Sequence, residues 1–165
     1  PKEIPCVLAI GRIEGLGATN VIPDKVELQG TFRTMNELWR STAHKLIHEI
    51  SKNVISDSNG SIDVRIENGY PYLENHSELT EHTRSLLKDV LSESQVVDLP
   101  IRMTGEDFSF FAQKIPATFI RLGVRNESRG IVHGVHNARF DIDESALLTG
   151  VKTLLAIALK SGNNV

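Results

Sequence analysis

The chain has 165 residues, of which 40% are hydrophobic and 24% charged. This composition is that of a folded globular protein rather than a disordered one, and the length suits one ordinary domain or two small lobes. The formal net charge of -3 gives no reason to expect nucleic acid or an anionic membrane as a partner. No apolar run approaches the roughly 20 residues that span a bilayer. The one cysteine, Cys6, cannot form an internal disulfide, which favours a reducing, cytoplasmic compartment.

Hydrophobic patterning predicts three strands in the first part of the chain. The run Cys6–Ile13 is apolar on both parities, as in a central strand, whereas residues 26–32 and 62–66 alternate with a period of two. Between these two runs, apolar residues recur at helical spacing, and Thr34 with Glu37 resembles a capping box at the start of the helix. Three half-buried strands covered by one helix predict a small two-layer α+β lobe.

A second lobe is predicted after Gly69-Tyr70-Pro71, which interrupts the pattern and places the lobe boundary near residue 70. A helix follows, with Asn75 or Ser77 as its cap. The run Thr104-Gly105-Glu106-Asp107 has the spacing of another capping box, and it predicts a short helix that ends before Pro116.

The last part of the chain is predicted to contain a strand and a long helix. Residues 117–122 are apolar enough for a buried strand, and Asp141 with Glu144 is expected to cap the final helix. The second lobe is therefore also a mixture of helix and strand.

Polar residues in loops and at helix starts could carry chemistry. A neutral imidazole in a strand-to-helix turn, such as His133 or His136, is a good metal ligand or general base, although histidines in loops commonly have neither role. Glu106 and Asp107 are expected in the first turn of a helix, where the macrodipole favours negative charge whatever the function. Carboxylates there can also orient a histidine that binds a metal, or contact the substrate directly.

Asn20 and Arg33 suggest a carboxylate site at the strand ends. An arginine and an asparagine on adjacent strand ends suit a carboxylate by bidentate pairing, but Asn20 could equally organise a turn and Arg33 could simply be exposed. The chain contains no G-x-S-x-G elbow, no P-loop and no G-x-G-x-x-G motif after a strand, which argues against a nucleophilic hydrolase or a nucleotide enzyme.

Five short motifs follow one another along the chain, and their order is more specific than any one of them. They are Asn20-Val21-Ile22-Pro23-Asp24, Gly30-Thr31-Phe32-Arg33-Thr34, Tyr70-Pro71, Gly105-Glu106-Asp107-Phe108 and His136-Asn137-Ala138-Arg139-Phe140-Asp141-Ile142-Asp143-Glu144. Together they resemble the aminoacylase and carboxypeptidase superfamily of two-metal hydrolases, and within it most closely the hippurate hydrolases and indole-acetyl-amino-acid hydrolases. The resemblance covers essentially the whole chain.

The resemblance implies an α+β fold in two parts. Residues 1–70 would form most of a ferredoxin-like lid lobe whose first strand and helix are missing. Residues 71–165 would form the C-terminal α/β part of a zinc-peptidase-like catalytic domain. In this family a homodimer through the lid is common.

The resemblance also assigns roles to the candidate residues. It implies that His136 is a metal ligand, that Asn20 and Arg33 hold the carboxylate of the substrate from the lid, and that Glu106 and Asp107 have a supporting or substrate-side role. The intact enzyme would hold two divalent metal ions, which could be zinc, manganese, cobalt or nickel. His133 does not match a ligand position of the family.

The function that follows is hydrolysis of the amide bond of N-acyl or peptidyl amino acids by a longer parent enzyme. The segment that normally carries the other metal ligands and the catalytic glutamate would lie before Pro1. Because zinc-type sites need three or four protein ligands, we expect this chain alone to be inactive. The alternative is a non-catalytic α+β interaction or dimerisation module, in which an exposed sheet edge pairs with a partner.

Overall fold

The computed structural model describes residues 2–161, and it confirms a mixed α+β fold. The chain forms two compact units. The first contains residues 2–73 together with Ile101–Phe110, and the second contains Glu74–Pro100 together with residues 111–161. Whether these units act as a lid and as part of a catalytic domain stays a prediction. Among the described residues, no helix is long and apolar enough to cross a membrane.

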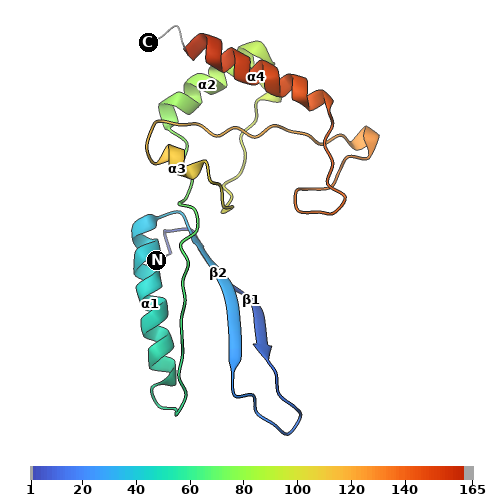
Figure 1. Ribbon diagram of the computed structural model, residues 1–165. Coiled ribbons are helices and arrows are strands. Elements are labelled where there is room, and N and C mark those ends of the chain that lie inside the picture. Colours follow the sequence, from blue (N-terminus) through green and yellow to red (C-terminus); the bar gives the residue numbers. More distant parts are fainter. Residues whose placement is uncertain (1, 162–165) are drawn as a thin grey trace. The chain divides into compact units, whose positions relative to one another are not determined.

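An antiparallel hairpin of β1 (Cys6–Gly15) and β2 (Val26–Thr34) begins the first unit (Figure 1). Gly15 pairs with Val26 next to the connecting loop, and Cys6 pairs with Thr34 at the other end of the hairpin. The register shifts between Ile10 and Arg12, which marks a β-bulge. The expected first two strands are thus confirmed.

The hairpin has one apolar face and one mainly polar face. Because side chains alternate along a strand, the register brings Leu8, Ile10, Ile13, Leu28 and Phe32 to one face. Gly30 lies on this face, and a Cβ there would come within 2.4 Å of the carbonyl oxygen of Ala9. Glycine therefore allows the two strands their close approach at this pair.

Helix α1 (Glu37–Ile55) packs against β2 on the apolar face, where the Phe32 and His44 rings meet edge-on with centroids 6.2 Å apart. Its cap is not the predicted Thr34. Asn36 is the N-cap, and its side chain accepts a hydrogen bond of 2.8 Å from the backbone N–H of Trp39. Glu37 instead accepts from the backbone N–H of Tyr72 at 3.0 Å and pairs with Arg40.

The prediction of a third strand at residues 62–66 is wrong, although the alternation of apolar and polar residues there is partly reflected in their burial. Val64 and Ile66 are half-buried, while their polar neighbours are exposed. However, residues 61–69 form no ladder with any described strand. A strand is defined by backbone hydrogen bonds to a partner, and β1 and β2 pair only with each other among the described residues.

Two helices form the centre of the second unit. α2 (Ser77–Val90) and α4 (Ser145–Ser161) pack against each other, and α2 buries Thr83, Leu86 and Leu87. The cap of α2 is neither predicted residue, because His76 accepts through Nδ1 from the backbone N–H of Leu79 at 3.3 Å.

Short helical turns complete the described elements. They are η1 (Glu93–Gln95), α3 (Ser109–Ala112), which crosses from the first unit into the second, and η2 (Glu127–Arg129).

The predicted strand at residues 117–122 is also absent, and Asn75 takes the place of a strand partner. The Asn75 side chain donates to the carbonyl oxygen of Phe119 at 3.1 Å and accepts from its N–H at 2.8 Å. The N–H of His76 donates to the carbonyl oxygen of Ala117 at 2.8 Å. An amide side chain thus satisfies the backbone groups that a ladder would otherwise pair.

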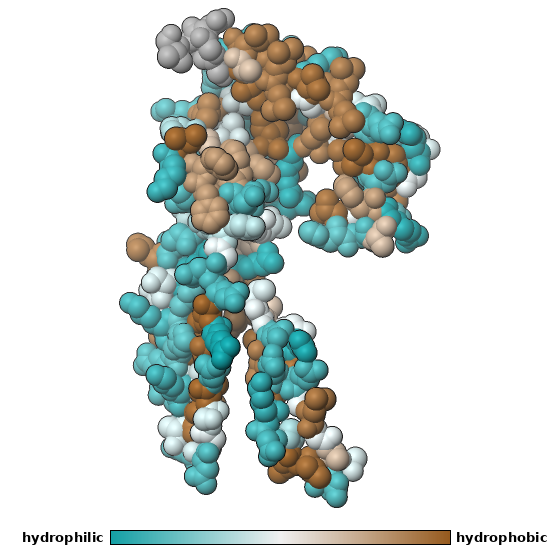
Figure 2. All heavy atoms as spheres, viewed as in Figure 1, coloured by the Kyte–Doolittle hydropathy of each residue, from teal (hydrophilic) through white to brown (hydrophobic). Residues whose placement is uncertain are grey.

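Helix α4 exposes many apolar side chains on the face seen in Figure 2. Exposed fractions of its leucines and valine range from 54% to 71%, for Leu147, Leu148, Val151, Leu154, Leu155 and Leu159. Only Thr153 of this helix is buried among the described residues.

Candidate functional site

His136 lies in the loop between residue 131 and helix α4, in the second unit. Its φ angle is 69°, in the left-handed region, where a residue other than glycine is uncommon. The side chain is exposed, and it makes no hydrogen bond or ion pair within the described part of the chain. An imidazole held on a strained backbone and left without a partner suits a ligand role.

The two ends of this loop meet at Asp143, which is 8% exposed. Its carboxylate accepts from the Nδ2 of Asn126 at 2.5 Å and from the Nη1 of Arg129 at 2.9 Å. It also accepts from the backbone N–H of Ser145, the first residue of α4, at 3.1 Å. The hydrogen bonds, first the one from Asn126, lower the pKa of Asp143 from its usual value to about 2.

Asp143 therefore takes the capping position that the sequence assigned to Asp141 and Glu144. Asp141 is exposed, and its carboxylate accepts from the N–H of the next residue, Ile142, at 2.8 Å. An N-cap carboxylate satisfies a free donor at the helix start and interacts favourably with the macrodipole.

Glu106 and Asp107 lie before a helix rather than in its first turn, because α3 begins only at Ser109. The Glu106 carboxylate accepts from the N–H of Phe108 at 3.3 Å, and its carbonyl oxygen accepts from the fully buried Ser109. Asp107 is exposed. Both residues thus form a turn whose shape is set by Ser109.

Arg33 contacts the segment that carries this turn. Its Nη1 donates to the carbonyl oxygen of Met103 at 2.6 Å, three residues before Glu106. Among the described residues this is its only side-chain hydrogen bond, so the rest of the exposed guanidinium keeps free donors. Arg33 therefore joins β2 to the Glu106 turn within the first unit and can still bind an anion.

Asn20 lies in an exposed turn at the far end of the same hairpin. The N–H groups and carbonyls of Ala18 and Val21 pair with each other around it. From Val26, beside this loop, to Arg33 there are seven steps along β2, which at about 3.3 Å each is roughly 23 Å. This length is too great for Asn20 and Arg33 of one copy of the chain to hold the same small carboxylate.

The described residues do not make up a complete metal site. Within residues 2–161, no three His, Cys, Asp or Glu side chains are grouped so that they could hold a metal ion. His136 and the pair Glu106 and Asp107 belong to different units. His136 has the donor type that zinc prefers, and within residues 2–161 it belongs to no such group of three.

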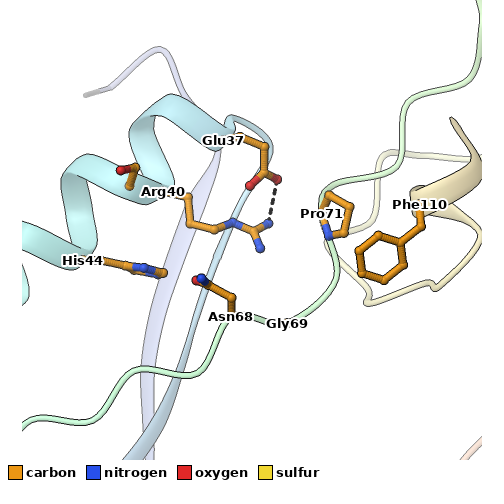
Figure 3. A pocket seen from close by; sticks show the side chains of 8 residues that line it. Glu37, Arg40, His44, Asn68, Gly69, Pro71 and Phe110 are labelled. Atoms are coloured by element: carbon orange, nitrogen blue, oxygen red, sulfur yellow. Dashed lines mark ion pairs between the residues drawn. The ribbon is translucent and has the colours of Figure 1, made fainter. Parts of the chain in front are cut away.

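The first unit contains a hollow of about 330 Å³ that none of the predicted site residues lines (Figure 3). Arg40 crosses it, pairing with Glu37 at 3.1 Å and donating to the carbonyl oxygen of Tyr70 at 2.8 Å. Its Nε is buried and has no hydrogen-bond partner among the residues that the structure describes. Arg40 thus connects the first turn of α1 to the Tyr70 segment, and Ser41, His44 and Glu37 are among the polar residues that line the hollow.

Sequence reasoning missed the anchors around the candidate residues. The carbonyl of Met103 carries no side-chain signal, so its bond to Arg33 could not be foreseen. Asn126 and Asp143 did have a signal, because an Asn before an E-S-R-G turn and an Asp two residues before a helix are both typical capping residues.

Comparison with known proteins decides the family. The sequence profile of Peptidase family M20/M25/M40 matches residues 5–160. The chain belongs to this family. It is 32% identical over 160 residues to thermostable carboxypeptidase 1 of Saccharolobus solfataricus, and the match covers 96% of this chain and 40% of the carboxypeptidase.

Two further relatives extend the comparison. The chain is 35% identical over 152 residues to the N-acetyldiaminopimelate deacetylase of Leuconostoc mesenteroides, with 90% of this chain and 37% of the deacetylase covered. The fold is similar to the crystal structure of the Bacillus subtilis YXEP protein, a dinuclear metal binding peptidase from the M20 family. The two structures have a TM-score of 0.75 and a sequence identity of 20%. The match covers 97% of this chain and 43% of the other. The chain thus spans about 40% of the length of the M20 relatives that it matches.

Proposed function

We propose that this chain forms part of a metal-dependent M20 amidohydrolase that cleaves the amide bond of N-acyl or peptidyl amino acids. Membership of the family carries this proposal, supported by relatives that are named a carboxypeptidase and a deacetylase of an acylated amino acid. Both names describe cleavage of a C–N bond in a small substrate that carries a carboxylate. We propose the cytoplasm as its compartment.

His136 is the residue that we assign to the metal. Two divalent cations, when bound, would lower the pKa of a shared water and polarise the amide carbonyl. Their identity among zinc, manganese, cobalt and nickel stays open. The chain contributes one exposed imidazole, and the absence of a three-ligand group among residues 2–161 supports the expectation that the isolated chain is inactive.

Arg33 is the residue that we assign to the substrate carboxylate. Its guanidinium is exposed, has donors left over after the bond to Met103, and lies in the unit that carries Glu106 and Asp107. For these two carboxylates we propose a supporting role, in which they shape the turn beside the substrate.

Arg33→Ala in the full-length protein tests this assignment. Losing a charge-assisted pair should raise KM for an N-acyl amino acid roughly 10- to 100-fold, with little change for the same compound as its C-terminal amide. The matched control is Arg12→Ala, because Arg12 lies on the same face of the hairpin and pairs with Glu14. Equal losses on the acid and on the amide would refute the carboxylate role.

Asn20 can serve the same carboxylate only from a second copy of the chain. We therefore include a homodimer through the first unit in the proposal, with Asn20 of one copy facing Arg33 of the other. Asn20→Ala and Arg33→Ala proteins should each be impaired, and mixed dimers of the two should recover activity because one of their two sites is intact. No recovery in verified mixed dimers would exclude this arrangement.

A non-catalytic interaction module is the second candidate. It is favoured by one observation, namely that each strand of the described two-stranded sheet has an unpaired edge. A full-length protein without metal and without amidohydrolase activity, yet dimeric, would favour this reading.

A further inference from the structure

The loop that carries His136 has both ends fastened by one buried carboxylate. On one side of the loop, Asp143 accepts from the side chains of Asn126 and Arg129. The N–H of Asp143 also donates to the carbonyl oxygen of Val124, in the segment before the loop, at 2.9 Å. On the other side of the loop, the Asp143 carboxylate accepts from the N–H of Ser145. One residue therefore joins the segment before the loop to the start of helix α4.

The segment before the loop, residues 126–131, forms a turn that is closed by its own hydrogen bonds. Asn126 and Ile131 exchange two backbone hydrogen bonds of 2.9 Å each, and the Oδ1 of Asn126 accepts from the hydroxyl of Ser128. Gly130 takes the left-handed φ of 73° that this turn requires. The turn at 126–131 thus presents Asn126 to Asp143 in a fixed orientation.

The loop between these anchors has few constraints of its own. Within residues 132–142, the backbone bonds are local, from Asn137 to the Gly134 carbonyl at 3.3 Å and from Phe140 to the Asn137 carbonyl at 2.9 Å. His136 nevertheless holds a left-handed backbone conformation, which persists only where the surroundings impose it. The bond from Asn137 to the Gly134 carbonyl closes a four-residue turn with His136 in its third position, where some turn types need a positive φ. The fixed ends connect this turn to the rest of the second unit.

The position requires a carboxylate rather than an amide. Asp143 receives three side-chain or backbone donors on its two oxygens. An asparagine offers one acceptor oxygen, and its NH2 group would face the donors of Asn126 or Arg129 and leave one of them unsatisfied. The low pKa of Asp143 agrees with a carboxylate surrounded by donors.

We propose that Asp143 is a positioning residue for His136, acting through the turn at 126–131 and the start of α4. The part of this inference that concerns a ligand rests on the proposed function, because it takes His136 as the group that is positioned. The part that concerns the loop stands on the contacts alone.

Hydrogen exchange and zinc binding by the full-length protein test the inference with Asp143→Asn. We expect amides in residues 132–142 to exchange roughly tenfold faster or more, with exchange in α2 unchanged, and zinc affinity to fall about 10- to 100-fold, as for other residues that orient a ligand. The matched control is Asp141→Asn, an exposed carboxylate in the same loop, which should change neither quantity.

The outcomes separate this inference from the proposed function. Unchanged exchange in residues 132–142, or an equal acceleration in α2, would overturn the positioning role. Faster loop exchange in Asp143→Asn, combined with full zinc affinity in His136→Ala, would keep the loop anchor and reject His136 as a ligand. Should Asp143→Asn fail to fold, Arg129→Gln removes the more exposed partner and should give a smaller change in the same direction.

Discussion

At residue 136 the backbone pays a conformational cost that glycine would avoid. A left-handed conformation costs an ordinary residue roughly 1–2 kcal/mol, and His136 has a φ of 69°. Retaining histidine there is understandable if the side chain is needed for another purpose, such as a metal.

His136→Gly compared with His136→Ala measures this cost. Both variants lose the imidazole, but only alanine keeps the unfavourable Cβ. We therefore expect the free energy of unfolding of the glycine variant to be about 1 kcal/mol higher than that of the alanine variant. Urea denaturation of the two proteins gives the difference. An alanine variant as stable as the glycine variant would mean that the loop does not hold the left-handed conformation.

Asp143 predicts a pH dependence of stability. Its pKa in the folded protein is about 2, below the value of about 4 expected in the unfolded chain. The folded state is therefore favoured by the ionised carboxylate above pH 4, and this contribution is lost as the pH falls through the range from 4 to 2.

The comparison with Asp143→Asn isolates this contribution. The free energy of unfolding of the wild-type protein should exceed that of the variant by a constant amount above pH 5, and the difference should shrink between pH 4 and pH 2. Denaturant titrations at several pH values provide the measurement. A difference that grows on acidification would show that the contacts of Asp143 are not those of an ionised group.

The residue types of the site could be recognised from the sequence, but their contacts could not. His136, Arg33 and Glu106 stand in motifs that resemble a known family, whereas the bond from Arg33 to Met103 goes to a backbone carbonyl. Backbone acceptors are the same at every position, so such a contact leaves no trace in the sequence. The spacing of thirteen residues between Asn20 and Arg33 does not give their separation in space, which depends on the register of the hairpin.

At the scale of elements, the N-cap observed at the start of helix α1 differs from the predicted one. The sequence favoured Thr34, but the side-chain oxygen of Asn36 accepts from the backbone N–H of Trp39. The hydroxyl of Thr34 is buried and has no hydrogen-bond partner among residues 2–161. A helix start has several capping candidates within three residues, and local pattern alone does not choose among them.

Two substitutions distinguish these caps. Asn36→Ala should lower the free energy of unfolding by about 1 kcal/mol, since it removes a cap. Thr34→Val replaces an unsatisfied buried hydroxyl by a methyl group of the same shape and should be neutral or slightly stabilising. Thermal or urea unfolding measures the stability of both variants. A larger loss of stability in Thr34→Val than in Asn36→Ala would indicate that Thr34 is the cap.

Helices and the hairpin could be predicted, whereas two of the predicted strands do not form. A helix satisfies its own backbone groups, and β1 and β2 are neighbours in sequence that pair with each other. The runs at 62–66 and 117–122 have the composition of strands but no ladder partner among the described residues. Composition indicates that a segment can be a strand, and pairing depends on segments elsewhere.

At the scale of the whole molecule, the chain spans about 40% of the M20 relatives that it matches. Its candidate residues lie in two units, Arg33 and Glu106 in the first and His136 in the second. The described residues supply too few ligands for a metal site. We therefore propose that this chain supplies part of a metal and substrate site rather than a complete one.

The metal content of the full-length protein, in His136→Ala and in His133→Ala, tests the central claim most directly. His133 lies three residues away in the same loop and does not match a ligand position, so it is the matched control. After equilibration with zinc and removal of free metal, His133→Ala should keep the wild-type zinc content. His136→Ala should lose at least one of the bound ions. Equal, full zinc content in both variants would contradict the assignment of His136 as a metal ligand.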